Sequence, residues 1–183
     1  TEKFCLTKDS YILFLGRLVP EKGIRYLVEA FKDVKTEKKL VIAGGSSDTD
    51  SFMVELKELA KDDDRIIFTG FVQGQMLDEL YSNAYIYTLP SDLEGMPLSL
   101  LEAMSYGNCC LVSDIPECTE VVEDKALIFK KSDVDELREK LQDACDYPEK
   151  VKEMKAQAAD LICKKYNWDD VVEETMKLYR RKQ

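Results

Sequence analysis

Two carboxylates, Glu94 and Glu102, stand eight positions apart on either side of a predicted helix start. They cannot form a tight catalytic dyad, because one precedes the helix and the other lies about a turn and a half inside it. They are better suited to accept hydrogen bonds from hydroxyls at opposite ends of one long ligand, as acidic residues do for ribose in dinucleotide sites. One alternative stays open: Ser99 and Glu102 form a capping box, and Glu94 is a favourable charge near the helix N-terminus.

The residues after Glu94 predict an anion site. Pro97 suits the first turn of a helix, so the amides of Gly95, Met96 and Leu98 are expected to point outward from its N-terminus. A helix N-terminus carries partial positive charge and attracts anions, and Gly95 lets a ligand approach the backbone closely.

A second charged segment, GRLVPEKG, begins at Gly16. It lacks the Gly-x-Gly-x-x-Gly spacing of a dinucleotide site, and no Ser or Thr follows Lys22 as a Walker motif requires. Arg17 and Lys22 could instead converge on one anion, with Arg17 able to bind phosphate bidentately. Alternatively, both are solvated turn charges and Glu21 pairs with one of them. Together with the helix end, the two cations would hold a diphosphate without a metal.

Metal and histidine chemistry are not predicted. Histidine is absent, which removes the usual general base and the commonest metal ligand. Two Asp-x-Asp spacings, at Asp48 to Asp50 and at Asp62 to Asp64, favour a loop before a helix and a solvated turn over a metal site. We therefore predict no metal and no cofactor.

Short apolar runs alternate with helical patterns along most of the chain. The runs are rich in β-branched or aromatic residues, and they predict buried strands at 11–16, 38–44, 65–70, 84–89, 109–114 and 126–130. Apolar residues at helical spacing predict helices between the strands at 24–34, 51–61, 76–84, 97–106 and 117–122. The same spacing predicts helices after the last strand at 132–146, 148–166 and 168–181.

This alternation predicts an α/β fold: a Rossmann-like, doubly wound parallel sheet of about six strands with extra C-terminal helices. The expected strand order is 3-2-1-4-5-6, and such sheets bind ligands outside the carboxyl ends of the strands where the order reverses. The two charged segments follow the first and fourth strands, on both sides of that point. Because no linker is evident, we expect one domain over residues 1–183, with 148–183 as a helical tail.

Composition narrows the class of protein. The 183 residues are 45% hydrophobic and 34% charged, which suits one sizeable core. The formal net charge of −10 argues against nucleic-acid binding, which normally takes a positive face. No apolar stretch approaches a membrane span and the first residues do not look like a signal peptide, so we expect a cytoplasmic protein. Six scattered cysteines fit buried, reduced thiols.

From about Tyr11 to the C-terminus, the chain resembles the retaining glycosyltransferases of group 1, also called family 4, which have the two-domain GT-B fold. The resemblance rests on six motifs in order: GRLVPEKG, GGSSDTDSF, FTGFV, EGMPLSLLEAMSYG with its Glu-x7-Glu spacing, SDIPECTEVV and YNWDDVVEETMKLY. It implies that this chain is the C-terminal domain, which binds a nucleotide-diphosphate sugar donor.

The resemblance also implies residue roles. Arg17 and Lys22 would neutralise the donor diphosphate, Glu94 would hold the transferred sugar, and Glu102 would accept from the ribose hydroxyls. The amides after Glu94 would hold the β-phosphate, and the backbone after the third strand would contact the base. Catalytic roles thus fall to Arg17, Lys22 and Glu94, and donor-binding roles to Gly16, Phe71, Val72, Gly95, Met96, Pro97, Leu98 and Glu102.

The same resemblance implies a transfer that retains anomeric configuration and usually needs no metal. The family's N-terminal acceptor domain, which usually carries a catalytic histidine, is expected to be absent from this chain. The isolated domain is therefore expected to bind a nucleoside diphosphate weakly, without metal, and to transfer no sugar. For the full-length protein, peripheral attachment to a membrane stays open.

Two other functions are alternatives. A nucleotide-binding, Rossmann-like domain of a dehydrogenase is disfavoured, because the glycine fingerprint is missing after the first strand. A non-catalytic interaction module would not need to keep the charged residues that the resemblance assigns to the site, namely Arg17, Lys22, Glu94 and Glu102.

Overall fold

One six-stranded parallel sheet forms the centre of the molecule, in the order β3-β2-β1-β4-β5-β6. The structure is a computed structural model that describes residues 2–45, 50–166, 172–173 and 176–177. The strands are β1 (Tyr11–Leu15), β2 (Lys39–Ala43), β3 (Ile66–Gly70), β4 (Ile86–Leu89), β5 (Cys110–Ser113) and β6 (Leu127–Phe129). The predicted fold class and strand order are confirmed.

Helices connect the strands and follow the last one. They are α1 (Ile24–Lys32), α2 (Asp50–Ala60), α3 (Gln75–Asn83), α4 (Leu98–Ser105), α5 (Pro116–Val122), α6 (Val134–Asp146) and α7 (Pro148–Lys165). Short 3-10 turns at Glu2–Phe4 and Pro20–Lys22 were not predicted. The helix predicted over 168–181 lies outside the described residues, apart from 172–173 and 176–177.

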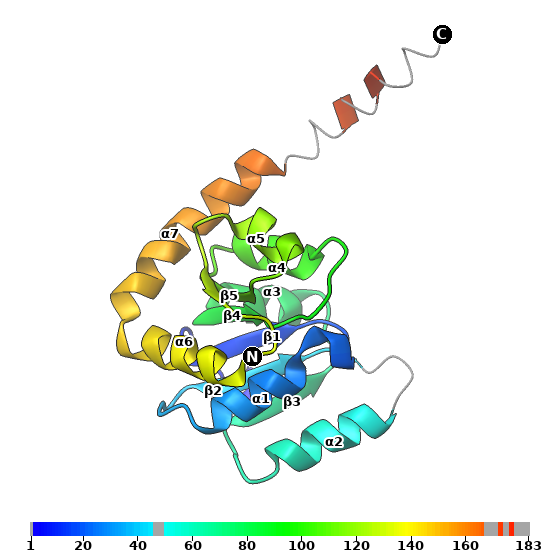
Figure 1. Cartoon of the computed structure of the whole chain (residues 1–183), viewed down its shortest axis with the longest axis vertical. Helices are drawn as coiled ribbons and strands as arrows, with labels where there is room; N and C mark the ends of the chain where they lie inside the picture. Colours follow the sequence, from blue (N-terminus) through cyan, green and yellow to red (C-terminus); the bar gives the residue numbers. More distant parts are fainter. Residues whose placement is uncertain (1, 46–49, 167–171, 174–175, 178–183) are drawn as a thin grey trace.

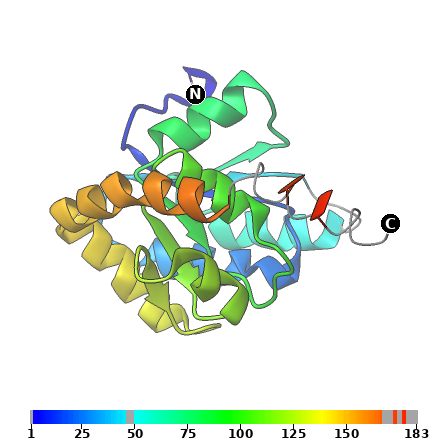
Figure 2. The same cartoon turned by 90° about the horizontal axis from the view of Figure 1, so that it is seen from above.

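Helices cover both faces of the sheet. Helices α1, α2 and α6 lie on one side and α3 lies on the opposite side (Figures 1 and 2). Helix α4 joins α3 on that side, because the Tyr81 hydroxyl of α3 reaches the Ser99 carbonyl of α4. Helix α7 packs against both α6 and α4, so the C-terminal part of the chain braces the helix that carries Glu102.

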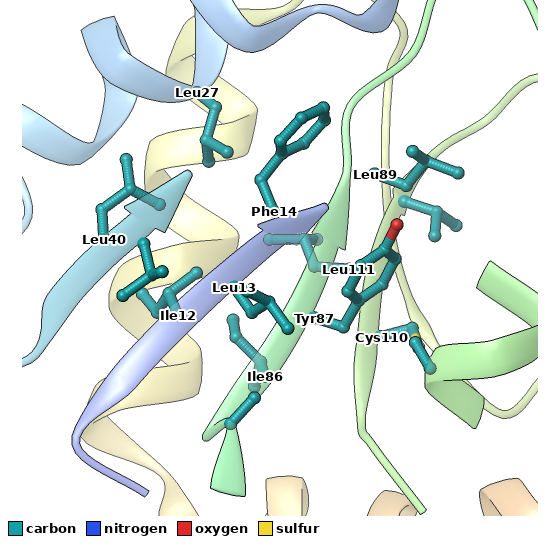
Figure 3. Packing of buried hydrophobic residues seen from close by; sticks show 14 of the residues in the cluster. Ile12, Leu13, Phe14, Leu27, Leu40, Ile86, Tyr87, Leu89, Cys110 and Leu111 are labelled. Carbon is teal, nitrogen blue, oxygen red and sulfur yellow. The ribbon is translucent and has the colours of Figure 1, made fainter. Parts of the chain in front are cut away.

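The inner strands are mostly apolar because both faces of the sheet are covered, whereas the edge strand β3 is only partly buried. In β1, Ile12, Leu13 and Phe14 are all fully buried, although successive side chains point to opposite faces. Figure 3 shows this packing, with Leu40 and Ile86 beside β1. Ile12 pairs with both of these residues, which fixes the register of β1 between β2 and β4.

Candidate functional site

The loops that follow β1 and β4 lie against each other where the strand order reverses. The Asp92 amide donates a 2.8 Å hydrogen bond to the Glu21 carbonyl. Gly23 has a φ of +67°, and a Cβ there would lie 1.9 Å from the Pro90 carbonyl oxygen, so only glycine fits this contact. The two charged segments are therefore neighbours, as their positions after the first and fourth strands predict.

An ion pair joins these two loops. The Lys22 Nζ atom lies 2.7 Å from each carboxylate oxygen of Glu94, and the side chains are 16% and 4% exposed. The Ser91 hydroxyl donates a further 2.6 Å hydrogen bond to Glu94 Oε1. The partner of Lys22 is thus Glu94 from across the site, and the alternative of a local pair with Glu21 does not hold for this lysine.

Arg17 lies in the same loop as Lys22 and lines a separate hollow. The hollow has a volume of about 260 Å³ and is lined by Leu15, Gly16, Arg17, Gly44, Gly45, Phe71 and Val72. The loops after β1 and β2 touch through their backbones here, since a Cβ at Gly44 would lie 1.8 Å from the Gly16 carbonyl oxygen. Phe71 is 75% exposed, whereas Val72 is buried. The structure therefore gathers four predicted site residues, Gly16, Arg17, Phe71 and Val72, around one space.

The start of α4 differs from its prediction. Pro97 precedes the helix and the first helical residue is Leu98. The Leu98 amide donates to the Met96 carbonyl at 2.9 Å, because Pro97, with φ −79° and ψ 72°, closes a tight turn. The expectation that Leu98 offers a free amide is wrong. Gly95 is exposed and a Cβ there would meet no atom within 4 Å, so a ligand can approach its backbone.

Glu102 is exposed on α4 and is held by a buried tyrosine. The Tyr81 hydroxyl donates to Glu102 Oε2 at 3.1 Å. Burial raises the pKa of Tyr81 well above its ordinary value, so this hydroxyl stays protonated and remains a donor. The ring of Tyr81 stacks on Tyr106 with centroids 5.2 Å apart, and the Tyr106 hydroxyl donates to Asp78 at 2.6 Å.

The capping-box alternative for Ser99 and Glu102 is wrong. Ser99 is the second residue of α4, and its hydroxyl is 2.8 Å from the Tyr87 hydroxyl. Tyr87 also donates to the Leu15 carbonyl at 3.1 Å, so it ties the end of β1 to α4. Within the part of the chain that the structure describes, no side chain caps the N-terminus of α4.

Sequence reasoning missed the hydroxyl groups that support the site. Tyr81 and Tyr87 fit the apolar spacing of a helix and a strand, so their hydroxyls gave no separate signal. Ser91 stands within the same loop as Glu94, and its short spacing from that acid is the clue that could have identified it.

The acidic turn after α2 is structural. Asp63 accepts from Arg65 at 2.9 Å and 2.7 Å, and this hydrogen bonding holds the pKa of Asp63 below its ordinary value. In the other Asp-x-Asp spacing, Asp48 lies outside the described residues. Among the described residues, no three or more His, Cys, Asp and Glu side chains are placed to hold a metal ion.

The six cysteines differ in burial, and Cys145 is intermediate. Cys109, Cys110 and Cys118 are buried, as expected. Cys5 and Cys163 are exposed, so the expectation of burial is wrong for them: one lies in the N-terminal turn and the other on the outer side of α7. No helix in the described ranges combines the length and hydrophobicity needed to cross a membrane.

The sequence matches a known protein family over most of the chain. The family model described as glycosyl transferases group 1 matches residues 3–161. O-antigen chain mannosyltransferase B from Escherichia coli is 28% identical over 98% of this chain and 48% of that protein. Alpha-D-kanosaminyltransferase from Streptomyces kanamyceticus is 25% identical over 98% of this chain and 47% of that protein. The chain thus spans about half the length of these relatives.

Solved structures show the same fold. HepE from Anabaena, in complex with UDP and glucose, superposes with a TM-score of 0.88 at 15% identity, over 95% of this chain and 49% of that chain. Sucrose-phosphate synthase from Thermosynechococcus elongatus superposes with a TM-score of 0.84 at 25% identity, over 98% and 47% respectively.

Proposed function

Because the chain belongs to the group 1 glycosyl transferases, we propose that it forms the donor-binding half of an enzyme that transfers a sugar from a nucleotide-diphosphate sugar. The observation that carries the proposal is the Lys22–Glu94 pair, which joins the loops after β1 and β4 at the reversal of strand order. This is where open parallel sheets bind nucleotides. The relatives named above transfer different sugars, so the donor sugar and the acceptor are not assigned.

The diphosphate of the donor would lie between the two loops. Lys22 has three protons on Nζ and gives two of its hydrogen bonds to Glu94, which leaves a third for a phosphate oxygen. Arg17 is exposed at the adjoining hollow and can bind phosphate from the other side. The exposed backbone at Gly95 adds amides near the N-terminus of α4.

The transferred sugar would extend from one end of the diphosphate, and the ribose with its base from the other. Glu94 would hold the transferred sugar, and Glu102, fixed by Tyr81, would accept from the ribose hydroxyls. The base would occupy the 260 Å³ hollow beside Phe71 and Val72. These assignments follow the resemblance. The position of Glu94 after β4 and the hollow beside Phe71 and Val72 support those of the transferred sugar and the base.

Several finer features belong to the same proposal. We propose a retaining, metal-independent transfer of the family 4 type, because Arg17, the remaining Nζ proton of Lys22 and the N-terminus of α4 offer the positive groups that a metal would otherwise supply. The preceding half of such an enzyme would bring the acceptor site, and the proposed location is the cytoplasm, with peripheral membrane attachment of the full-length protein left open.

Titration of the 183-residue chain with UDP, GDP, ADP and NAD in the presence of EDTA tests the proposal. Saturable binding of one nucleoside diphosphate is expected, with no requirement for divalent metal. Binding of NAD alone would favour a dehydrogenase domain. Absence of binding to all four nucleotides would favour an interaction module and would contradict the proposal.

A further inference from the structure

A fully buried serine stands behind the ion pair of the site. Ser91 follows β4 and is 0% exposed. Its hydroxyl donates to Glu94 Oε1 at 2.6 Å, the same oxygen that also accepts from Lys22 at 2.7 Å. Glu94 therefore accepts three hydrogen bonds, two from a cation and one from a neutral group that is itself out of reach of solvent.

Ser91 is fixed from both sides. Its carbonyl accepts a 2.5 Å hydrogen bond from the hydroxyl of Ser113, which ends β5 and is also fully buried. The carbonyl of the preceding residue, Pro90, lies against Gly23 of the other loop. Two strands and the neighbouring loop thus hold the Ser91 hydroxyl in one place before any ligand binds.

We propose that Ser91 is a positioning residue: it orients the Glu94 carboxylate, and through Glu94 it aims the remaining Nζ proton of Lys22 at the donor diphosphate. The inference rests on the proposed function. A carboxylate that is 4% exposed needs hydrogen bonds to its lone pairs, and those made to a charged group are the strong ones. Lys22 has a flexible stem, so its direction depends on what holds its ammonium group.

Without the Ser91 hydroxyl, Glu94 Oε1 loses one of its two donors inside a buried space. The carboxylate is then free to rotate, and Lys22 follows it. Ser91 itself is buried behind Glu94, so it would act on the ligand only through the pair. A purely structural serine would instead lower stability and leave the ligand's contact with Lys22 unchanged.

A double-mutant cycle on nucleoside diphosphate binding separates these two roles. The affinities of wild type, Ser91→Ala, Lys22→Gln and the double variant are measured by calorimetry with whichever of UDP, GDP and ADP binds wild type best. Ser91→Ala is expected to raise Kd about five- to tenfold in the wild-type background, by loss of one charge-assisted hydrogen bond. In the Lys22→Gln background the same change is expected to raise Kd less than about twofold.

Two further variants complete the test. Ser10→Ala removes a serine hydroxyl that donates to a backbone carbonyl, as the Ser113 hydroxyl does, but Ser10 directly precedes β1, at the amino end of the strand and away from the site, so its Kd should match wild type. Ser113→Ala keeps the test decisive should Ser91→Ala not fold, because it loosens the Ser91 backbone and should weaken binding only when Lys22 is present.

The outcomes distinguish the inference from the proposed function. Unchanged affinity of both Ser91→Ala and Ser113→Ala, or equal weakening in both Lys22 backgrounds, would overturn the positioning role while the donor-binding function stands. Failure of the wild-type chain to bind any of the three nucleotides would overturn both.

Discussion

The Nζ atom of Lys22 lies 2.7 Å from both carboxylate oxygens of Glu94, although the two residues are 72 positions apart in the sequence. Each comes from a loop at the carboxyl end of a different strand, and the strands β1 and β4 pair directly. The pair therefore places a cation and an anion at the reversal of strand order, in the setting where the ligand is expected.

Loss of the cation is expected to weaken diphosphate binding. Lys22→Gln should raise the Kd of the preferred nucleoside diphosphate about tenfold or more, because one charge-assisted contact to phosphate is lost. Arg25→Gln is the matched control: it also removes one positive charge, but Arg25 pairs with Glu29 and Glu55 at the surface. Calorimetry should show near wild-type affinity for this control, and equal weakening in both variants would contradict a local role of Lys22.

Loss of the anion is expected to destabilise the fold. Glu94→Gln leaves Lys22 with an uncompensated charge at a position that is only 16% exposed, so the free energy of unfolding should fall by about 3 kcal/mol. Glu55→Gln removes the exposed partner of Arg25 and should cost less than about 1 kcal/mol. Urea unfolding of both variants measures the two losses of unfolding free energy. Similar losses would contradict a larger contribution of the buried pair to stability.

The fold could be predicted because local pattern and topology agree. Runs such as YILFL in β1 are apolar at every position, which only a strand covered on both faces requires. Right-handed crossovers then leave few arrangements of six such strands. The boundaries of the helices were harder to predict. At Pro97 a tight turn precedes α4, where the first helical turn was expected. The tendency of proline to begin helices does not distinguish these two conformations.

The site could be predicted only in outline. The order of the elements predicts that Lys22 and Glu94 lie near each other, at the carboxyl ends of β1 and β4. That Lys22 pairs with Glu94 and not with Glu21 depends on backbone contacts between distant loops, which the sequence does not show. The hydrogen bond from Tyr81 to Glu102 could not be predicted, for a different reason. A tyrosine in an amphipathic helix gives the same pattern whether its hydroxyl is used or not.

Glu102 is expected to act on the nucleoside and not on the phosphates. Glu102→Gln should raise the Kd of the preferred nucleoside diphosphate about threefold or more, because a neutral amide oxygen accepts less strongly from a ribose hydroxyl. The Kd of inorganic pyrophosphate should stay unchanged. Because Glu102 caps no helix, the free energy of unfolding should change by less than about 0.5 kcal/mol. An equal effect on pyrophosphate, measured by calorimetry, would contradict a ribose contact.

The six cysteines are expected to differ in reactivity. Burial raises the pKa of Cys109 and of Cys118 to about 12, and the pKa of Cys110 is also raised by burial, so these thiols stay protonated at pH 8. A chromogenic disulfide reagent should react quickly with the exposed Cys5 and Cys163 and with these three only in urea. Cys145 is partly buried and burial raises its pKa, so it should react more slowly than the two exposed thiols. The Cys5→Ser, Cys163→Ser double variant should lose the fast phase, and labelling of Cys109, Cys110 or Cys118 without urea would contradict their burial.

The turn between α2 and β3 is expected to make stability depend on pH in the acid range. Arg65 donates to Asp63 and also to the carbonyls of Val34 and Thr36, so it fastens the turn to the segment that follows α1. Hydrogen bonding from Arg65 lowers the pKa of Asp63 below its ordinary value of 3.8. A carboxylate with a lowered pKa in the folded state stabilises the protein above its unfolded-state pKa, and that contribution is lost as pH falls through the folded-state pKa.

Asp63→Asn should therefore lower the free energy of unfolding by about 1 kcal/mol at pH 7. The difference from wild type should shrink as the pH falls below about 4. The exposed Asp62, as Asp62→Asn, is the control and should change stability little. Urea unfolding between pH 7 and pH 2.5 measures all three proteins, and a wild-type advantage over Asp63→Asn that stays constant across this range would show that the ionised form of Asp63 is not what holds the turn.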